Sequence, residues 1–461
     1  MKRLLLPFFA LLLVVPSASA QTVAPKWEHV ESFPDAPGGR YDDMVFLDTQ
    51  RGWVVNTRGE IWNTEDGGQT WNLQTDKGVP FRSVAFREED GPFGEVGWAG
   101  TVFRPESVLW ETRDGGEHWI DISHRIYGDK PDGICGIYTR GQYAWGVGAF
   151  HGTPTIIKTS DGGITWHGRA VGNLAGGLID VYFQDENIGF AVGGTGDNLD
   201  GLAVILRTED GGETWEQAFV STLTPGANSE WAWKISFPSR DVGYVSVEYP
   251  SNSNGPTAKV LKTEDGGLSW REIMIPGSTQ SAGLQGIGFI SESTGWASGR
   301  GTTSLTTDGG ETWQRVSHYN PLSKEGQLDG SMNRFFVVND TLAYGVGKRL
   351  YPLSGLELIS TATEPSVVPE SFTMDPPFPN PFTEKTTLRY HLDKSSIVRV
   401  QIIDVLGRMH RTFPAEFKQP GDYELMWDGR DDSGVRLASG NYILLIDIGE
   451  SMETKQVVFL K

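Results

Sequence analysis

Two carboxylates and two cations recur at one position of a strand pattern that repeats along the chain. Alignment on a neighbouring aromatic-small-Val/Ser-Gly motif gives a column of seven residues: Asp43, Ser83, Cys135, Asp180, Lys234, Gly286 and Arg334. Arg82 and Trp233 stand one residue earlier. Two carboxylates at a defined separation, here Asp43 and Asp180, could hydrolyse a glycosidic bond. A ring of this kind could also bind a ligand, or be solvated polar residues that line a channel. The candidate binding residues are Asp43, Arg82, Asp180, Trp233, Lys234 and Arg334.

The sequence gives no clear signal for other chemistry. The acidic segments around Asp197 and Asp428 lack the spacing of a calcium-binding loop, so turns are expected there. The eight His are scattered without a pair at ligand spacing, which argues against zinc. No Gly-x-Ser-x-Gly elbow occurs, and Gly193–Gly196 opens no helix. We therefore predict no metal, no cofactor and no assigned catalytic residue.

The composition favours an all-β protein that does not bind nucleic acid. The 461 residues include 58 Gly and 16 Trp, and only 38% are hydrophobic, which suits short strands, glycine turns and large buried rings. The formal net charge of −20 opposes binding to nucleic acid, which needs clustered basic charge. A single cysteine, Cys135, excludes an internal disulfide.

A short repeat indicates how the aligned residues are positioned. The motif Thr-x-Asp-Gly-Gly-x-Thr/Ser-Trp recurs six times with small variations, every 43 to 55 residues, with its Asp at Asp66, Asp114, Asp161, Asp210, Asp265 and Asp308. Each period holds about four short strands, the content of one propeller blade. The fifth period predicts strands over 232–237, 243–247, 258–262 and 269–273. The motif then lies on the hairpin between the third and fourth strands, where Asp and Gly stabilise the turn.

These motifs are Asp-boxes, and the repeat resembles the Asp-box (BNR) β-propellers. That group includes sialidases, xyloglucan-cleaving hydrolases, sortilin-type receptors and photosystem II assembly or stability factors. The photosystem factors resemble this chain most in the sequence of the repeat. The resemblance implies a turn-forming role for the six Asp residues. The Arg-Ile/Leu-Pro signature of sialidases is missing, and Arg40–Asp43 occupies that region.

Both ends of the repeat array predict closure into a ring. A seventh partial repeat at 333–352 lacks a box and an outer strand, whereas Lys26–Val30 resembles the segment that follows a box. We expect the N-terminal segment to supply the missing strand of a seven-bladed propeller over residues 21–360. The boxes should share a face with the loops between first and second strands. The opposite face, with the more variable loops, should hold any binding site.

The remaining segments predict export. Residues 1–20 have the charged start, apolar run and Ala-Ser-Ala end of a secretory signal peptide. Residues 361–375 form a Pro/Ser/Thr/Glu-rich linker, and short alternating strands from 376 to 461 indicate an immunoglobulin-like sandwich. Four motifs there, which begin at Phe378, Asp404, Trp427 and Ala438, resemble the C-terminal sorting domain of the type IX secretion system. The latter half is also similar to the Ig-like domain of the flagellar hook-capping protein. The resemblance implies delivery through the periplasm to the outer surface or medium.

The sequence thus favours an exported, non-enzymatic propeller that binds a protein or glycan, with a secreted glycoside hydrolase as the alternative. The type IX machinery is the expected partner of residues 376–461, and no transmembrane segment is expected. If the aligned column binds the ligand, charge reversal at Asp180 or Lys234 should abolish binding and leave stability within about 1 kcal/mol. The same change in a box should lower stability and spare binding.

Overall fold

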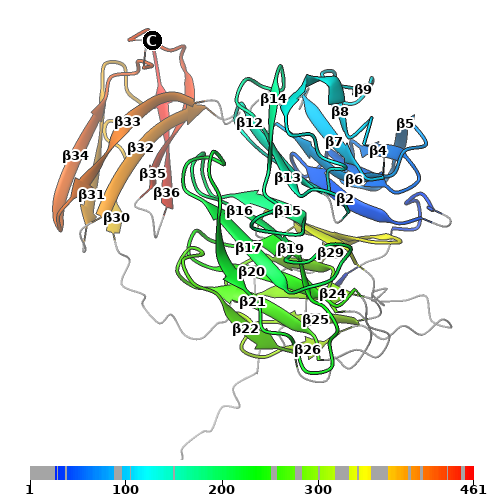
Figure 1. Ribbon diagram of the computed structural model, residues 1–461. Coiled ribbons are helices and arrows are strands. Elements are labelled where there is room, and N and C mark those ends of the chain that lie inside the picture. The colour runs from blue at the N-terminus through cyan, green and yellow to red at the C-terminus, as the bar shows by residue number, and fades with distance from the viewer. Residues whose placement is uncertain are drawn as a thin grey trace, which may run out of the picture. The chain divides into compact units, whose positions relative to one another are not determined.

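The computed structural model shows two compact units, Gln21–Ile359 and one that contains Ser360–Lys461 (Figure 1). The described residues are 26–27, 30–36, 39–87, 96–103, 105–148, 151–250, 257–275, 283–299, 302–316, 332–339, 342–354, 372–392, 396–404, 409–432, 434–447 and 452–461. The predicted signal peptide and most of the predicted linker lie outside these residues. Within them, no helix has the length and apolar character needed to cross a membrane.

The first unit consists of β-sheets of the predicted blade type. The first three sheets contain β2 (Tyr41–Phe46), β3 (Gly52–Asn56), β4 (Glu60–Thr64) and β5 (Asn72–Asp76); β6 (Phe81–Phe86), β7 (Gly97–Thr101), β8 (Leu109–Thr112) and β9 (Ile120–Asp121); and β11 (Gly136–Arg140), β12 (Tyr143–Gly148), β13 (Thr155–Thr159), β14 (Trp166–Ala170) and β10 (Ile126–Gly128). The next three contain β15 (Gly177–Phe183), β16 (Gly189–Gly194), β17 (Ala203–Thr208) and β18 (Glu216–Val220); β19 (Trp231–Ser236), β20 (Gly243–Glu248), β21 (Lys259–Thr263) and β22 (Arg271–Met274); and β23 (Gly286–Phe289), β24 (Gly295–Gly299), β25 (Thr302–Thr306) and β26 (Gln314–Arg315).

The last sheet of this unit joins the two ends of the repeat array. It contains β27 (Arg334–Asn339), β28 (Leu342–Val346), β29 (Leu350–Ser354) and β1 (Lys26–Trp27). Strand β1 pairs antiparallel with β29, with Trp27 opposite Leu353, as the N-terminal segment predicted. The inner strands contact one another in the cyclic order β2, β6, β11, β15, β19, β23, β27 and back to β2. The predicted all-β propeller is confirmed.

Large rings and glycines pack each sheet. In five sheets a Phe at or just after the end of the first strand covers the Gly that begins the second, as Phe46 covers Gly52 and Phe183 covers Gly189. A Cβ atom at Gly52 or Gly189 would lie 2.5 Å or 2.4 Å from that ring, so only glycine fits. Trp145 then stacks on Phe183 with ring centroids 3.6 Å apart, which joins neighbouring sheets. The high Gly and Trp content follows from this packing.

The two faces of the propeller carry different loops. In five repeats the first box Gly donates its backbone N–H to the loop between the first and second strands, as Gly67 does to the Gln50 carbonyl at 2.7 Å. We call this side the box face. The other side carries the blade-to-blade connections and the loops between second and third strands, and we call it the funnel face. The predicted sharing of a face by boxes and first-to-second loops is confirmed.

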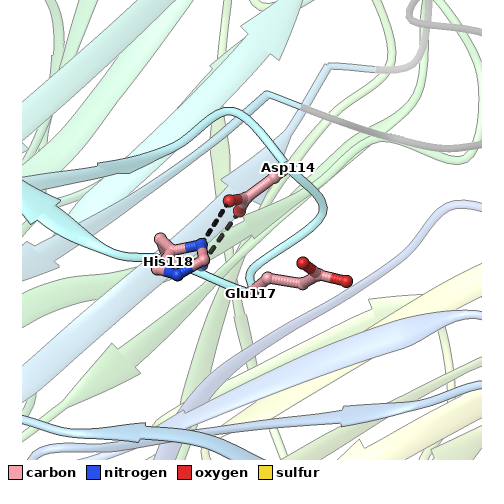
Figure 2. A group of neighbouring side chains, drawn as sticks. All are labelled: Asp114, Glu117 and His118. Atoms are coloured by element: carbon pink, nitrogen blue, oxygen red, sulfur yellow. Dashed lines mark hydrogen bonds and ion pairs between the residues drawn. The ribbon is translucent and has the colours of Figure 1, made fainter.

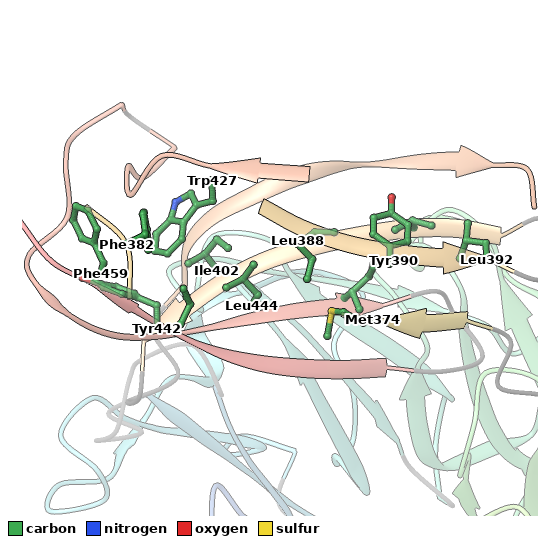
Figure 3. Close-up of a cluster of buried hydrophobic side chains, with 14 residues drawn as sticks. Met374, Phe382, Leu388, Tyr390, Leu392, Ile402, Trp427, Tyr442, Leu444 and Phe459 are labelled. Carbon is green, nitrogen blue, oxygen red and sulfur yellow. The ribbon is translucent and has the colours of Figure 1, made fainter. Parts of the chain in front are cut away.

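The second unit is a two-sheet sandwich. One sheet has the order β30 (Phe372–Met374), β31 (Thr386–Leu392), β34 (Gly421–Trp427), and the other β33 (Met409–Lys418), β32 (Ser396–Asp404), β35 (Gly440–Asp447), β36 (Met452–Phe459). Figure 3 shows the buried cluster between them, in which Trp427 packs on Phe382 and Tyr442. The predicted Ig-like sandwich is confirmed.

Three strands were not predicted from the pattern. Strand β10 adds a parallel fifth strand beside β14 in the third sheet. Strand β30 lies entirely within the predicted linker of residues 361–375, so the sandwich begins earlier than predicted, because Met374 belongs to its core. Strand β33 contains Pro414 yet forms, since it is an edge strand where a missing N–H can face solvent.

Candidate functional site

The aligned residues come together at the funnel-face end of the inner strands, through β-bulges. The β2, β6, β15 and β19 ladders all shift register there, next to Asp43, Ser83, Asp180 and Lys234 respectively. A bulge places an extra residue on one strand and redirects its side chains. The carboxylates of Asp43 and Asp180 each accept a backbone N–H of the following inner strand, from Val84 and Ile235 at 3.2 Å.

Arg334 connects the two predicted carboxylates. Its Nε lies 3.0 Å from Asp43 Oδ1, and its Nη1 donates to Asp180 Oδ2 at 2.8 Å. Lys234 Nζ lies 3.5 Å from the other Asp180 oxygen. Strand β15 is three places from β27 around the ring of inner strands, so these ion pairs connect strands on different sides of the ring.

A second network of ion pairs lies beside the first. Asp42 contacts both Arg82, at 2.8 Å, and Arg40, at 2.7 Å. The Arg82 guanidinium lies 5.3 Å from the centre of the Trp233 ring, within cation–π range. Arg40 also donates to Gln285, which in turn donates to Glu248. The structure therefore brings all six predicted binding residues into two neighbouring networks.

Most of the predicted binding residues are buried and not exposed to a ligand. Asp43, Asp180 and Lys234 are 1%, 2% and 3% exposed, and Arg82 and Trp233 are buried as well. They are not solvated groups that await a ligand. Reversing a charge at Asp180 or Lys234 would leave like charges buried together, so we now expect a loss of stability in place of the unchanged stability expected from the sequence.

Burial also sets the proton affinity of this network. The pKa of Asp43 is raised by burial, and Arg334 and Lys234 only partly oppose the shift. Burial alone would lower the pKa of Arg334, but Asp180 and Asp43 outweigh it and move that pKa above its usual value. Arg334 therefore remains a cation between the two carboxylates.

The six boxes form one repeated turn. Thr64 donates its hydroxyl to Asp66 and accepts the backbone N–H of Gly68, while Asp66 accepts both the backbone N–H and the hydroxyl of Thr70. The other boxes repeat these bonds, with Ser269 or His118 at the position of Thr70. Burial would raise the pKa of Asp210, but the hydrogen bonds from Thr214 and Thr208 outweigh it and lower the pKa to about 2.

The second box holds a group that sequence reasoning missed. Asp114, Glu117 and His118 have potential metal-ligand atoms within 4.8 Å of one another, and Figure 2 shows the Asp114 carboxylate facing the His118 ring. The signal was the His at a position where the other boxes have Thr or Ser. His118 Nδ1 contacts Asp114 at 2.7 Å, in the place of the usual hydroxyl, and its side chain is 80% exposed. Completion of the turn accounts for this contact.

A pocket of about 750 Å³ adjoins this box on the box face. Its walls include Asp48, Arg51, Gln74, Asp114 and Glu117. Several of these side chains are already paired within the protein. Arg51 bonds to Asp48 at 3.0 Å, and Gln74 joins Trp53 Nε1 to the Gly115 carbonyl. The pocket therefore belongs to the packing between the first and second repeats.

The funnel face carries a contiguous surface made by three loops. The sequence predicts variable loops at 102–107, 150–155 and 195–201 on this face, but it does not predict that they join. The rings of Phe103 and His151 lie 5.6 Å apart, and His151 Nδ1 lies 2.9 Å from Asn198 Oδ1. Leu199 packs beneath, against the buried cluster that includes Trp233. We call Phe103, His151, Asn198 and Leu199 the rim patch. It joins the second-to-third loops of three consecutive sheets.

Each of the two units is similar to a known protein family. Residues 19–141 match the family model described as photosynthesis system II assembly factor YCF48, and residues 382–446 match that of the FlgD Ig-like domain. The chain is 25% identical over 320 residues to the photosystem II assembly lipoprotein Ycf48 of Synechococcus sp. (strain CC9902). That alignment covers 67% of this chain and 82% of the relative.

Two solved structures show the same fold at low identity. YCF48 from Cyanidioschyzon merolae matches with a TM-score of 0.52 and 19% identity, over 71% of this chain and 99% of that one. A GH74 xyloglucanase from Xanthomonas campestris matches with a TM-score of 0.51 and 12% identity, over 93% and 69%. The chain thus consists of a propeller similar to the Ycf48 assembly factors, followed by an Ig-like sandwich similar to the FlgD Ig-like domain.

Proposed function

We propose that this protein binds a segment of a partner protein on the funnel face of its propeller, without catalysis. The buried ion-paired networks support the absence of catalysis, because Asp43 and Asp180, the two carboxylates that a hydrolase would use here, are buried and already paired with Arg334. The relatives named as photosystem II assembly factors point to a role exerted on other proteins. We do not propose photosystem II as the partner, because the C-terminal motifs resemble those of an exported cargo.

The glycoside hydrolase alternative has less support. A hydrolase needs one carboxyl to protonate the leaving group and another to act on the sugar or on water, both in reach of substrate. Asp43 and Asp180 are almost fully buried and share Arg334. The xyloglucanase likeness concerns the fold alone, which many functions share. We expect no hydrolysis of xyloglucan by the purified protein.

Blocking each face in turn tests the proposal. Cys135 is buried, so a cysteine introduced at Asn198 or at Leu268 can be coupled to polyethylene glycol maleimide. Leu268 is 68% exposed in a box and serves as the matched control. Pull-down from the native cell envelope should recover one discrete partner with the Leu268 conjugate and lose it with the Asn198 conjugate. Recovery with both conjugates would contradict the assignment to the funnel face, as would xyloglucan hydrolysis.

We also propose that the protein leaves the cytoplasm through the Sec system and crosses the outer membrane by a type IX route. Support comes from the signal-peptide pattern of residues 1–20 and from the four ordered motifs in residues 376–461. The exported protein should begin at Gln21, which N-terminal mass analysis would show. A chain ended near Glu364 should fold but stay in the periplasm of a type IX host. Its arrival at the cell surface would contradict the sorting role.

A further inference from the structure

The rim patch has an unusual backbone. Among the described residues, three non-glycine residues have a positive φ: Phe103 at 60°, Asn198 at 52° and Leu199 at 67°. Side chains disfavour this left-handed region because Cβ approaches the backbone carbonyl. All three residues lie in the rim patch, and strained backbone of this kind often accompanies ligand-binding loops.

The loop ends hold this backbone in place. Val102 is buried beside the strained Phe103, in the same cluster as Leu199 and Trp233. Trp231 Nε1 donates to the Asp200 carbonyl at 2.6 Å, and Leu202 donates its N–H to Thr195 Oγ1 at 2.9 Å. The strained residues therefore belong to anchored loops, which present their side chains in a fixed arrangement.

The exposed groups of the patch combine an aromatic ring with negative charge. Phe103 is 59% exposed although it is a large hydrophobic residue. Three exposed carboxylates lie on the same loops or against them. Asp197 and Asp200 flank the strained Asn198 and Leu199, and Asp132 accepts the N–H of Thr153, two residues from His151. An aromatic surface beside acidic groups complements a basic, aromatic segment, by ring stacking, cation–π contact and charge attraction.

We infer that the rim patch binds an extended segment of a partner polypeptide in which Lys or Arg side chains alternate with aromatic ones. The inference rests on the proposed binding function of the funnel face and specifies the chemistry of the partner. Phe103 and His151 receive the aromatic side chains, and Asp132, Asp197 and Asp200 attract the cations. Because these carboxylates are exposed, salt should weaken the interaction.

Phe103→Gly gives a sharp test, because binding and stability should respond differently. Glycine tolerates φ of 60° without strain, so the melting temperature should stay the same or rise. A fluorescein-labelled 12-residue peptide of alternating Lys and Phe should bind the purified full chain, and this variant should bind it at least tenfold more weakly. Asp197→Asn with Asp200→Asn should give a similar loss. A lower melting temperature with unchanged binding would mean that Phe103 only supports the fold.

Matched controls separate this chemistry from general attraction to an acidic protein. Leu268→Ser and Glu216→Gln remove an exposed apolar group and an exposed charge elsewhere, and both should bind the Lys/Phe peptide as the unchanged protein does. Peptides that alternate Glu with Phe, or Lys with Ser, should bind at least tenfold more weakly. Equal binding of all three peptides would overturn the inference. If the funnel face captures a partner whose bound segment is not basic and aromatic, only this inference fails and the proposed function stands.

Discussion

Substitution of Arg334 by Met should destabilise the propeller strongly. The change removes the cation that lies 3.0 Å from Asp43 and 2.8 Å from Asp180, both at most 2% exposed. Removing one partner of a buried ion pair costs about 3–5 kcal/mol, because the remaining charge stays buried without compensation. Lys234 still neutralises Asp180, so the unpaired charge falls mainly on Asp43. Urea unfolding at pH 7.5 measures this loss in the free energy of unfolding.

The loss should depend on pH with a defined sign. Burial raises the pKa of Asp43 in the folded state above its unfolded value of 3.8. The stability that this group contributes is therefore full below pH 3.8 and is lost as the pH rises through the folded pKa. Without Arg334 the pKa of Asp43 rises further, so the variant can protonate Asp43 in mild acid. The penalty should be smaller at pH 4.5 than at pH 7.5.

Two controls complete the test of Arg334. Arg169→Met alters an exposed arginine on β14 and should change stability by no more than about 0.5 kcal/mol. Asp43→Asn combined with Arg334→Met removes both charges and should lose less than Arg334→Met alone. A single variant within about 0.5 kcal/mol of the unchanged protein at pH 7.5 would refute the network, and so would a penalty that does not vary with pH.

Three further outcomes are expected. Asp210→Ala removes the acceptor of the fourth box and should lower the free energy of unfolding by about 1–3 kcal/mol while partner binding persists, as thermal scans and pull-down would show. Because its folded pKa is depressed to about 2, Asp210 contributes stability that is present above pH 3.8 and lost as the pH falls towards 2; an acid titration followed by circular dichroism should show a smaller loss in Asp210→Asn. Trp27→Ala removes a ring whose centre lies 5.0 Å from that of Trp296, and it should lower the free energy of unfolding by about 3–5 kcal/mol. Deletion of residues 21–32 should lower the melting temperature at least as far as Trp27→Ala does.

Local and periodic features of the fold could be predicted from the sequence. The box depends on residues within eight positions of one another, so the motif alone predicts its turn. The partner of β29 could be predicted because the segment at Trp27 resembles the residues after a box. Strands such as β10 and β33 could not, because their pairing depends on edges that exist only after the sheets form.

The position of the candidate site could be predicted from the sequence, but the ion pairing of its residues could not. Alignment placed Asp43, Asp180 and Arg334 in one ring, yet only the folded distances show that Arg334 pairs with both carboxylates. The left-handed backbone of Phe103 had no sequence signal, since that conformation usually marks glycine or asparagine. The sequence therefore predicted the loops of the rim patch, but only the structure shows their contacts and their strained backbone.

Site-specific photo-crosslinking tests the central claim most directly. A photoreactive phenylalanine analogue would replace Phe103 on the funnel face or Leu268 on the box face, both of which are exposed, and illumination would take place in the native cells. We predict that the analogue at Phe103 forms one discrete adduct with another polypeptide and that the analogue at Leu268 forms none. An adduct at Leu268 alone, or none at either position, would contradict a propeller that binds its partner on the funnel face.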